Sequence, residues 1–146
     1  MLSVIVTRGN PDRLPGLLAA LTPAAVAGLV RDVQLVAGAD PALLDALCEA
    51  TGAREAQDLA QAVGRARSDW LMVIPPELRL KDGWTERLSD HLRDGGGAAR
   101  LEGIGARLLR RRPFGVLISR KAASVSAERG LQGLARQLGR RARRLG

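Results

Sequence analysis

Residues 68–77 constrain the fold more than any other segment of the chain. The apolar residues 70–74 are typical of a buried strand, and they are followed directly by Pro75 and Pro76. Two consecutive prolines supply no amide donors and restrict the residue before them. The strand is therefore predicted to end by Ile74, and the chain to leave the sheet there as a loop. In a parallel α/β sheet, ligands bind at the carboxyl ends of the strands, so this break falls where a site is expected.

Strand and helix signals alternate along the first two thirds of the chain. Continuous apolar, β-branched runs indicate the strands, and leucines at intervals of three and four indicate the helices. The predicted strands are residues 2–7, 32–38, 54–56 and 70–74, and the predicted helices are residues 14–22, 41–51, 59–67 and 84–93. This order favours a three-layer α/β domain, with a mostly parallel central sheet flanked by helices. The length of 146 residues suits one hydrophobic core.

The excess of positive charge lies entirely in the last part of the chain. Residues 1–106 carry 11 Lys+Arg against 14 Asp+Glu, a net −3, whereas residues 107–146 carry 12 against 1, a net +11. Because the charge is so uneven, the overall value of +8 does not by itself indicate a nucleic-acid partner. We divide the chain into a domain of residues 1–120 and a basic C-terminal segment of residues 121–146.

The basic segment has the leucine spacing of an amphipathic helix, predicted from about residue 130 onward. Four leucines align on one helical face, namely Leu131, Leu134, Leu138 and Leu145. Such a helix binds an anionic membrane surface, binds nucleic acid, or packs its leucines on the domain and solvates its arginines. The packing alternative is favoured, and nucleic acid is the least favoured partner.

The remaining composition excludes several kinds of protein. Cys48 is the only cysteine, so no disulfide forms within the chain, and its leucine neighbours indicate a core residue rather than a nucleophile. No Cys, Asp or Glu lies at a spacing from His91 that favours metal binding. His91 is therefore predicted to be a surface residue or to pack against its neighbours. There is neither a basic leader nor an apolar run near the roughly 20 residues of a membrane span. We expect a cytoplasmic protein, with peripheral contact to the inner membrane face if the basic segment binds lipid.

Four segments follow one another in an order that is specific although no single segment is. They are residues 3–10 with 14–21, residues 28–36, residues 69–74 with Gly83 and Trp84, and a weaker glycine-containing strand at 112–120. In this order they resemble the N-terminal half of a family-2 glycosyltransferase, the GT-A, nucleotide-diphospho-sugar transferase type. The resemblance implies a GT-A-like fold, a nucleotide-sugar donor and Mg²⁺ or Mn²⁺ as cofactor.

The resemblance implies a nucleotide site at the end of the first strand. Thr7 and Arg8 fall where the family contacts the nucleotide, and Arg8 either reaches a phosphate or is a solvated loop arginine. The family's base-binding aspartate falls on Ala37. Asp40 then either replaces that aspartate or caps the helix that begins at Pro41, and capping is favoured.

The acidic motifs of the family are largely missing. Its metal-binding Asp-x-Asp falls on Pro75, Pro76 and Glu77, so Glu77 alone keeps an oxygen ligand for Mg²⁺ or Mn²⁺, with a plain loop carboxylate as the alternative. Its later Glu-Asp pair, which contains the general base, has no counterpart, because Glu128 is the only acid after Glu102. We therefore assign no catalytic residue.

Two functions remain open after these comparisons of residues. The first is a glycosyltransferase of impaired activity, which transfers a sugar from a nucleoside-diphosphate donor to an acceptor that the sequence does not identify. The second is a catalytically inactive homologue that serves as a binding or assembly module, docked on an anionic membrane surface or a partner through its basic end.

Overall fold

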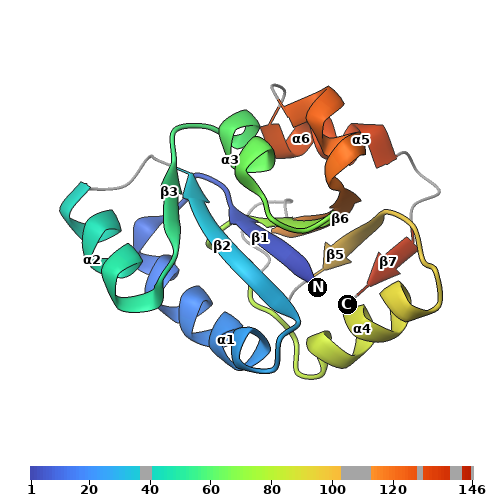
Figure 1. Ribbon diagram of the computed structural model, residues 1–146, viewed down its shortest axis with the longest axis horizontal. Helices are drawn as coiled ribbons and strands as arrows, with labels where there is room; N and C mark the ends of the chain where they lie inside the picture. The colour runs from blue at the N-terminus through green and yellow to red at the C-terminus, as the bar shows by residue number, and fades with distance from the viewer. Residues whose placement is uncertain (37–40, 103–112, 128–129, 139–142, 146) are drawn as a thin grey trace.

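The computed structural model describes residues 1–36, 41–102, 113–127, 130–138 and 143–145. Within these ranges the strands form one sheet in the order β3-β2-β1-β4-β6-β5-β7 (Figure 1). The strands are β1 (Leu2–Val6), β2 (Val30–Val36), β3 (Arg54–Ala56), β4 (Trp70–Ile74), β5 (Ala99–Glu102), β6 (Phe114–Ser119) and β7 (Arg143–Leu145). β6 runs antiparallel to β4 and β5, and the other neighbouring pairs are parallel.

Helices cover both faces of the sheet, which gives three layers. They are α1 (Leu14–Val26), α2 (Pro41–Thr51), α3 (Leu59–Arg65), α4 (Trp84–Arg93), α5 (Arg120–Ser126) and α6 (Gly130–Leu138), with a short 3-10 turn, η1 (Pro11–Arg13), before α1. α1 and α4 lie on one face, and α3, α5 and α6 lie on the other, while α2 lies beside β3 (Figure 1). The predicted three-layer α/β architecture with a mostly parallel sheet is confirmed.

The core is aliphatic and is divided by the sheet. All five residues of β1 are buried, as expected of a central strand covered on both faces. On one face Leu17 and Leu21 of α1 and Leu88 of α4 pack on the sheet, and on the other Ala62 of α3 and Leu134 of α6 do so. Burial of this apolar surface, at about 25 cal/mol per Å², is the main stabilising term of the domain.

β4 ends at Ile74, as the two prolines predicted. The chain then turns out of the sheet, and the turn is closed by the amide of Leu78, which donates to the carbonyl of Pro75 at 3.2 Å. β1 and β4 are in register, with Val6 beside Ile74. The turn after β4 therefore lies next to the loop after β1.

The first helix is longer than the leucine pattern predicted, because it continues through Pro23 to Val26. Ala24 is buried against the core, and this packing offsets the backbone hydrogen bond that Pro23 cannot make. Gly28, two residues beyond the end of the helix, has a φ of +85°, in the left-handed region. The amides of Gly28 and Leu29 donate to the carbonyls of Ala25 and Ala24, which is the Schellman ending that leads the chain into β2.

The C-terminal segment differs from its prediction. Gly130–Leu138 is helical as expected, but Arg143–Leu145 forms β7, paired in parallel with β5, so the prediction of one helix from residue 130 to the end is wrong there. β5 would otherwise present unpaired backbone groups at the edge of the sheet, and an extended segment satisfies them. Leu145 therefore packs with the core on the α1 and α4 face, away from the leucines of α6.

The leucines of α6 face the sheet. Leu134 is fully buried, and Leu131 and Leu138 pack against the same cluster. This placement favours the packing alternative for the basic segment over insertion of its leucines into a membrane. None of the helices in the described ranges is both long and apolar enough to cross a lipid bilayer.

Candidate nucleotide site

The direction of chain connection reverses beside β1. From β1 the chain continues to β2 and β3 on one side, and β4 then lies on the other side of β1. The carboxyl ends of β1 and β4 are held together, since the amide of Thr7 donates to the carbonyl of Ile74 at 2.9 Å. In open α/β sheets, ligands bind in the crevice outside the carboxyl ends of the strands at such a reversal.

A hollow of about 230 Å³, counting its open mouth, lies at this position. We call it the β1–β2 hollow, and it is lined by Val6, Thr7, Arg8, Gly9, Leu14, Leu35, Val36 and Pro76. Its floor is formed by apolar side chains at the ends of β1 and β2 and at the start of α1. Its rim is formed by the loop after β1 and by the turn after β4.

Arg8 lies across the rim of the β1–β2 hollow. Its guanidinium donates to the carbonyl of Gln57, which follows β3, at 3.2 Å. The side chain thus connects the ends of β1 and β3, across the carboxyl end of β2. An exposed guanidinium with five N–H donors in a fixed plane is suited to binding phosphate oxygens.

Glu77 faces the backbone of the loop after β1. Its carboxylate accepts a hydrogen bond from the amide of Asn10 at 2.5 Å. Gly9 lies so close that an added Cβ would be 2.5 Å from Oε1 and 2.7 Å from Oε2 of Glu77, and 2.7 Å from Cδ of Pro76. A side chain at position 9 would have to displace both the Glu77 carboxylate and the ring of Pro76. The hydrogen bond from Asn10 to Glu77 connects the two loops of the site.

The described residues at the ends of β1 and β4 do not offer a donor set that suits a divalent cation. Pro75 and Pro76 offer no side-chain ligand, and one oxygen of Glu77 already accepts from Asn10. Within the described ranges, no three His, Cys, Asp or Glu side chains lie close enough together to hold a metal. Mg²⁺ and Mn²⁺ bind about six ligands, mainly oxygens, so one engaged carboxylate is a poor site.

The structure brings three of the four predicted site residues to one edge of the sheet. Thr7 and Arg8 line the β1–β2 hollow, and Glu77 binds the adjacent loop. Asp40, the fourth, lies outside the described residues, as does Ala37 at the position of the family's base-binding aspartate.

Sequence reasoning missed the carboxylate that ends β5. Glu102 lies opposite Phe114 in the sheet, at the same edge as the carboxyl end of β4. It forms an ion pair with Arg144 of β7 at 3.7 Å. The only local signal for β5 is the short alternation of apolar and polar residues at 99–102, shortly after three glycines. Of these residues, Ala99 and Leu101 are buried.

Two other predicted positions lie away from this edge. His91 is buried, and its Nε2 lies 2.7 Å from the carbonyl of Gly97, so the prediction of surface or packing is confirmed as packing. Cys48 is partly buried and packs on the core, as predicted. Burial, followed by the charges of Glu55 and Asp45, raises the pKa of the Cys48 thiol, which disfavours the reactive thiolate.

Solved structures with the same architecture contain a nucleotide. The chain is similar to glucosyl-3-phosphoglycerate synthase from Mycobacterium tuberculosis in complex with Mn²⁺, UDP and glucosyl-3-phosphoglycerate, with a TM-score of 0.63 and 14% identity over 99% of this chain and 68% of that chain. A complex of the same synthase with Mn²⁺, UDP and phosphoglyceric acid matches with a TM-score of 0.56 and 16% identity, over 98% of this chain and 52% of that chain.

These matches establish the fold and nothing finer. The domain has a GT-A-like glycosyltransferase fold, as the order of segments in the sequence predicted. The chain spans roughly half to two thirds of the length of the synthase chains that it matches. No protein-family model and no curated protein matches the sequence.

Proposed function

We propose that the chain is a GT-A-like domain that binds a nucleoside diphosphate, or the diphosphate part of a nucleotide sugar, in the β1–β2 hollow without a divalent cation. The observation that carries the proposal is the hollow itself, which opens at the reversal of strand connection between β1 and β4. The synthase structures with the same fold hold UDP, which supports a nucleotide as the ligand.

Each site residue then has a proposed role. Arg8 binds a phosphate from the rim, and Thr7 supplies a hydroxyl beside it. Asp40 precedes Pro41 at the start of α2 and either contacts the base or caps this helix. Glu77 holds the loop after β1 through the amide of Asn10, so its role in this proposal is structural rather than metal binding.

Calorimetric titration with UDP and GDP tests this proposal. We expect dissociation constants on the order of 0.1 mM or weaker, because Ala37, at the position of the family's base-binding aspartate, has no side chain that could hydrogen-bond a base. Adding Mn²⁺, or replacing Glu77 by Gln, is expected to change them less than about twofold. Arg8→Met is expected to weaken binding at least about fivefold, since a charge-assisted phosphate contact is lost.

The matched control is Arg13→Met, which removes an exposed arginine of η1 outside the hollow. If the two arginine variants changed the dissociation constant equally, or if no binding were measured at millimolar nucleotide, the proposed site would be excluded. A micromolar, Mn²⁺-dependent dissociation constant that Glu77→Gln abolishes would instead restore a metal site and a metal-dependent transferase.

Glycosyl transfer is a second candidate function, and the position of Glu102 favours it. This carboxylate lies at the same edge of the sheet as the end of β4, where it could act as general base for an attacking acceptor hydroxyl. Its ion pair with Arg144 at 3.7 Å opposes this role, because it directs the carboxylate toward β7 rather than toward an acceptor. Release of UDP from UDP-glucose, with phosphoglyceric acid as acceptor, measures the activity, and its loss in Glu102→Gln would support Glu102 as the base.

A further inference from the structure

The edge of the sheet opposite the β1–β2 hollow holds arginines from separate elements around one loop. We call this edge, at which β1, β2 and β4 begin, the amino edge, and the loop consists of residues 66–69 between α3 and β4. Arg120 of α5 donates to the carbonyl of Ala66 at 2.8 Å, and Arg31 of β2 donates to the carbonyl of Arg67 at 3.3 Å. The side chain of Arg67 is itself exposed. Two distant elements therefore bring cations to a loop that already carries one.

An irregularity in β2 accompanies the position of Arg31. Leu2 of β1 pairs with Val30, whereas the next residue, Ser3, pairs with Asp32, so Arg31 is an extra residue in β2. Such a β-bulge changes the direction of a side chain from the regular alternation of a strand. Because β1 lies between β2 and β4, Arg31 reaches across the start of β1 to the loop before β4. The backbone is thus shaped so that this edge gains a cation.

The cations at this edge outnumber the acids beside them. We call the cations the amino-edge patch, which consists of Arg31, Arg67, Arg120 and Lys121. Of the nearby acids, Asp69 pairs with Arg120 at 3.7 Å, and Asp32 accepts a hydrogen bond from the hydroxyl of Ser3. Among the residues that the structure describes, no ion pair involves the other three cations. The patch therefore keeps a net positive charge that faces solvent.

Exposed apolar side chains accompany these cations. The large apolar side chains that are exposed in the described ranges are Met1, Val26 and Val125, at 67%, 83% and 79%. Met1 precedes β1, Val26 ends α1 shortly before β2, and Val125 lies four residues after Lys121, on the same face of α5. Exposed aliphatic side chains beside arginine and lysine suit the interface of an anionic lipid bilayer. Nucleic acid is a poorer partner, because the patch has no aromatic side chain on which bases stack.

We propose that the amino-edge patch docks the domain on an anionic lipid surface. A planar surface contacts cations that are spread along an edge, and their side chains need not converge on one head group. The docked domain keeps the β1–β2 hollow, at the carboxyl ends of the strands, open on the opposite side. The proposal uses no leucine of α6, since these face the sheet, and it does not depend on nucleotide binding.

Cosedimentation of the full chain with lipid vesicles tests this proposal. Phosphatidylcholine vesicles that contain about 30% phosphatidylglycerol are expected to bind the chain at least about tenfold more tightly than pure phosphatidylcholine vesicles. Added salt is expected to reduce this difference, because it screens the exposed charges. Equal binding to the two kinds of vesicle would overturn the proposal.

Two double variants of equal net charge locate the contact. Arg67→Gln with Lys121→Gln removes two exposed cations of the patch and is expected to lower the partition coefficient at least about tenfold, at about fivefold for each basic residue. Arg13→Gln with Arg79→Gln removes two exposed cations at the opposite edge of the sheet and is the matched control, with an expected loss below about twofold. Equal losses would show that binding follows net charge alone and would overturn the proposal.

Two further measurements separate lipid from nucleic acid. Val26→Asp is expected to weaken vesicle binding at least about tenfold, whereas Ala20→Asp, an exposed position earlier on the same helix, is expected to weaken it less than about threefold. Equal losses in these two variants would contradict a lipid contact at the amino edge. Binding of duplex DNA that the patch variant weakens, without binding to anionic vesicles, would assign the patch to nucleic acid and overturn the proposal.

Discussion

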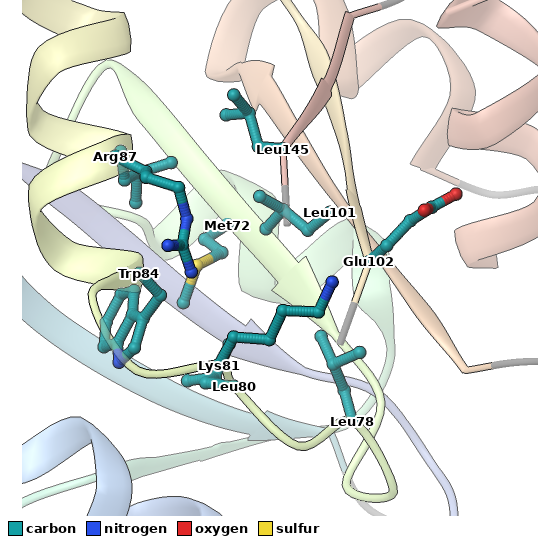
Figure 2. A pocket seen from close by; sticks show the side chains of 10 residues that line it. Met72, Leu78, Leu80, Lys81, Trp84, Arg87, Leu101, Glu102 and Leu145 are labelled. Atoms are coloured by element: carbon teal, nitrogen blue, oxygen red, sulfur yellow. The ribbon is translucent and has the colours of Figure 1, made fainter. Parts of the chain in front are cut away.

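The two halves of the sheet are built by different rules. β3, β2, β1 and β4 are parallel, and a helix connects each of them to the next in chain order, although the paired strands β1 and β4 are far apart in the sequence. β6, β5 and β7 are different, because β6 is inserted antiparallel between β4 and β5, and the edge strand comes from the end of the chain. The first half holds the β1–β2 hollow, whereas the second half contributes Leu101, Glu102 and Leu145 to the lining of a separate hollow beneath α4 (Figure 2).

Each half of the sheet has one acidic residue near the carboxyl end of a strand, and the contacts of these two residues can be compared. Glu77, in the first half, accepts a hydrogen bond from the amide of Asn10. Glu102, in the second half, pairs with Arg144 of β7. Each carboxylate therefore holds one chain segment to another. Both carboxylates at this edge of the GT-A-like fold are thus engaged with other segments of the chain.

The largest expected effect tests whether α6, which belongs to the second half, packs on the sheet as part of the same domain. Leu134→Ala removes a fully buried side chain of α6 and is expected to lower the free energy of unfolding by about 2–5 kcal/mol, measured by urea denaturation. The control is Val125→Ala on α5, where the side chain is 79% exposed and the expected change is within about 0.5 kcal/mol. Similar small effects of both variants would mean that α6 is not packed on the sheet.

The second prediction concerns the seam between the halves, where β4 pairs with β6. A Cβ added at Gly115 would lie 2.6 Å from Cγ2 of Ile74 and 3.2 Å from the carbonyl oxygen of Val73. Gly115→Ala is therefore expected to destabilise the domain by about 1–3 kcal/mol, because neither group can move without disturbing β4. In Gly64→Ala, on α3, the added Cβ meets nothing within 4 Å, and a gain of about 0.5–1 kcal/mol is expected. A neutral Gly115→Ala would show that the seam is loosely packed.

The third prediction sharpens the structural role of Glu77. Glu77→Gln replaces a charge-assisted hydrogen bond to Asn10 by a neutral one, and it is expected to lower stability by about 0.5–1.5 kcal/mol. Faster hydrogen exchange at the Asn10 amide is expected to accompany this loss. Glu49→Gln, an exposed change on α2, is the control. Unchanged exchange at Asn10 would contradict the tether between the two loops.

The smallest expected effect lies on α4, between the halves. The pKa of the Glu86 carboxyl group is lowered by two hydrogen bonds. The larger effect comes from the backbone amide of Glu86, and the smaller from the Thr85 hydroxyl, which donates at 2.9 Å. Because the folded-state pKa is lower than the unfolded one, Glu86 stabilises the domain above its unfolded pKa and loses this effect as pH falls through the folded pKa. The carboxylate is exposed, so the effect is small. NMR titration of this carboxyl group measures it, and Thr85→Val is expected to raise the pKa; an unchanged value would exclude the hydroxyl as a cause.

The sequence predicted the first half of the sheet well. Apolar runs, the break at Pro75 and leucines at helical spacing all act between residues close together in the chain. They located β1, β3 and β4 and placed Thr7, Arg8 and Glu77 near strand ends. β2 was predicted slightly late, and α1 continued through Pro23 because the burial of Ala24 depends on the packed core.

The sequence indicated β6 and α6 of the second half, whereas only the tertiary structure decided β5, β7 and the use of the charges there. The four residues of β5 are too short a pattern to predict a strand, and β7 is paired with β5 although some forty residues separate them. Such pairings depend on contacts between distant segments, whose free energy no local pattern contains. For the same reason the sequence showed Glu77 and Glu102 as carboxylates near strand ends, and only the folded chain brought Asn10 and Arg144 to them.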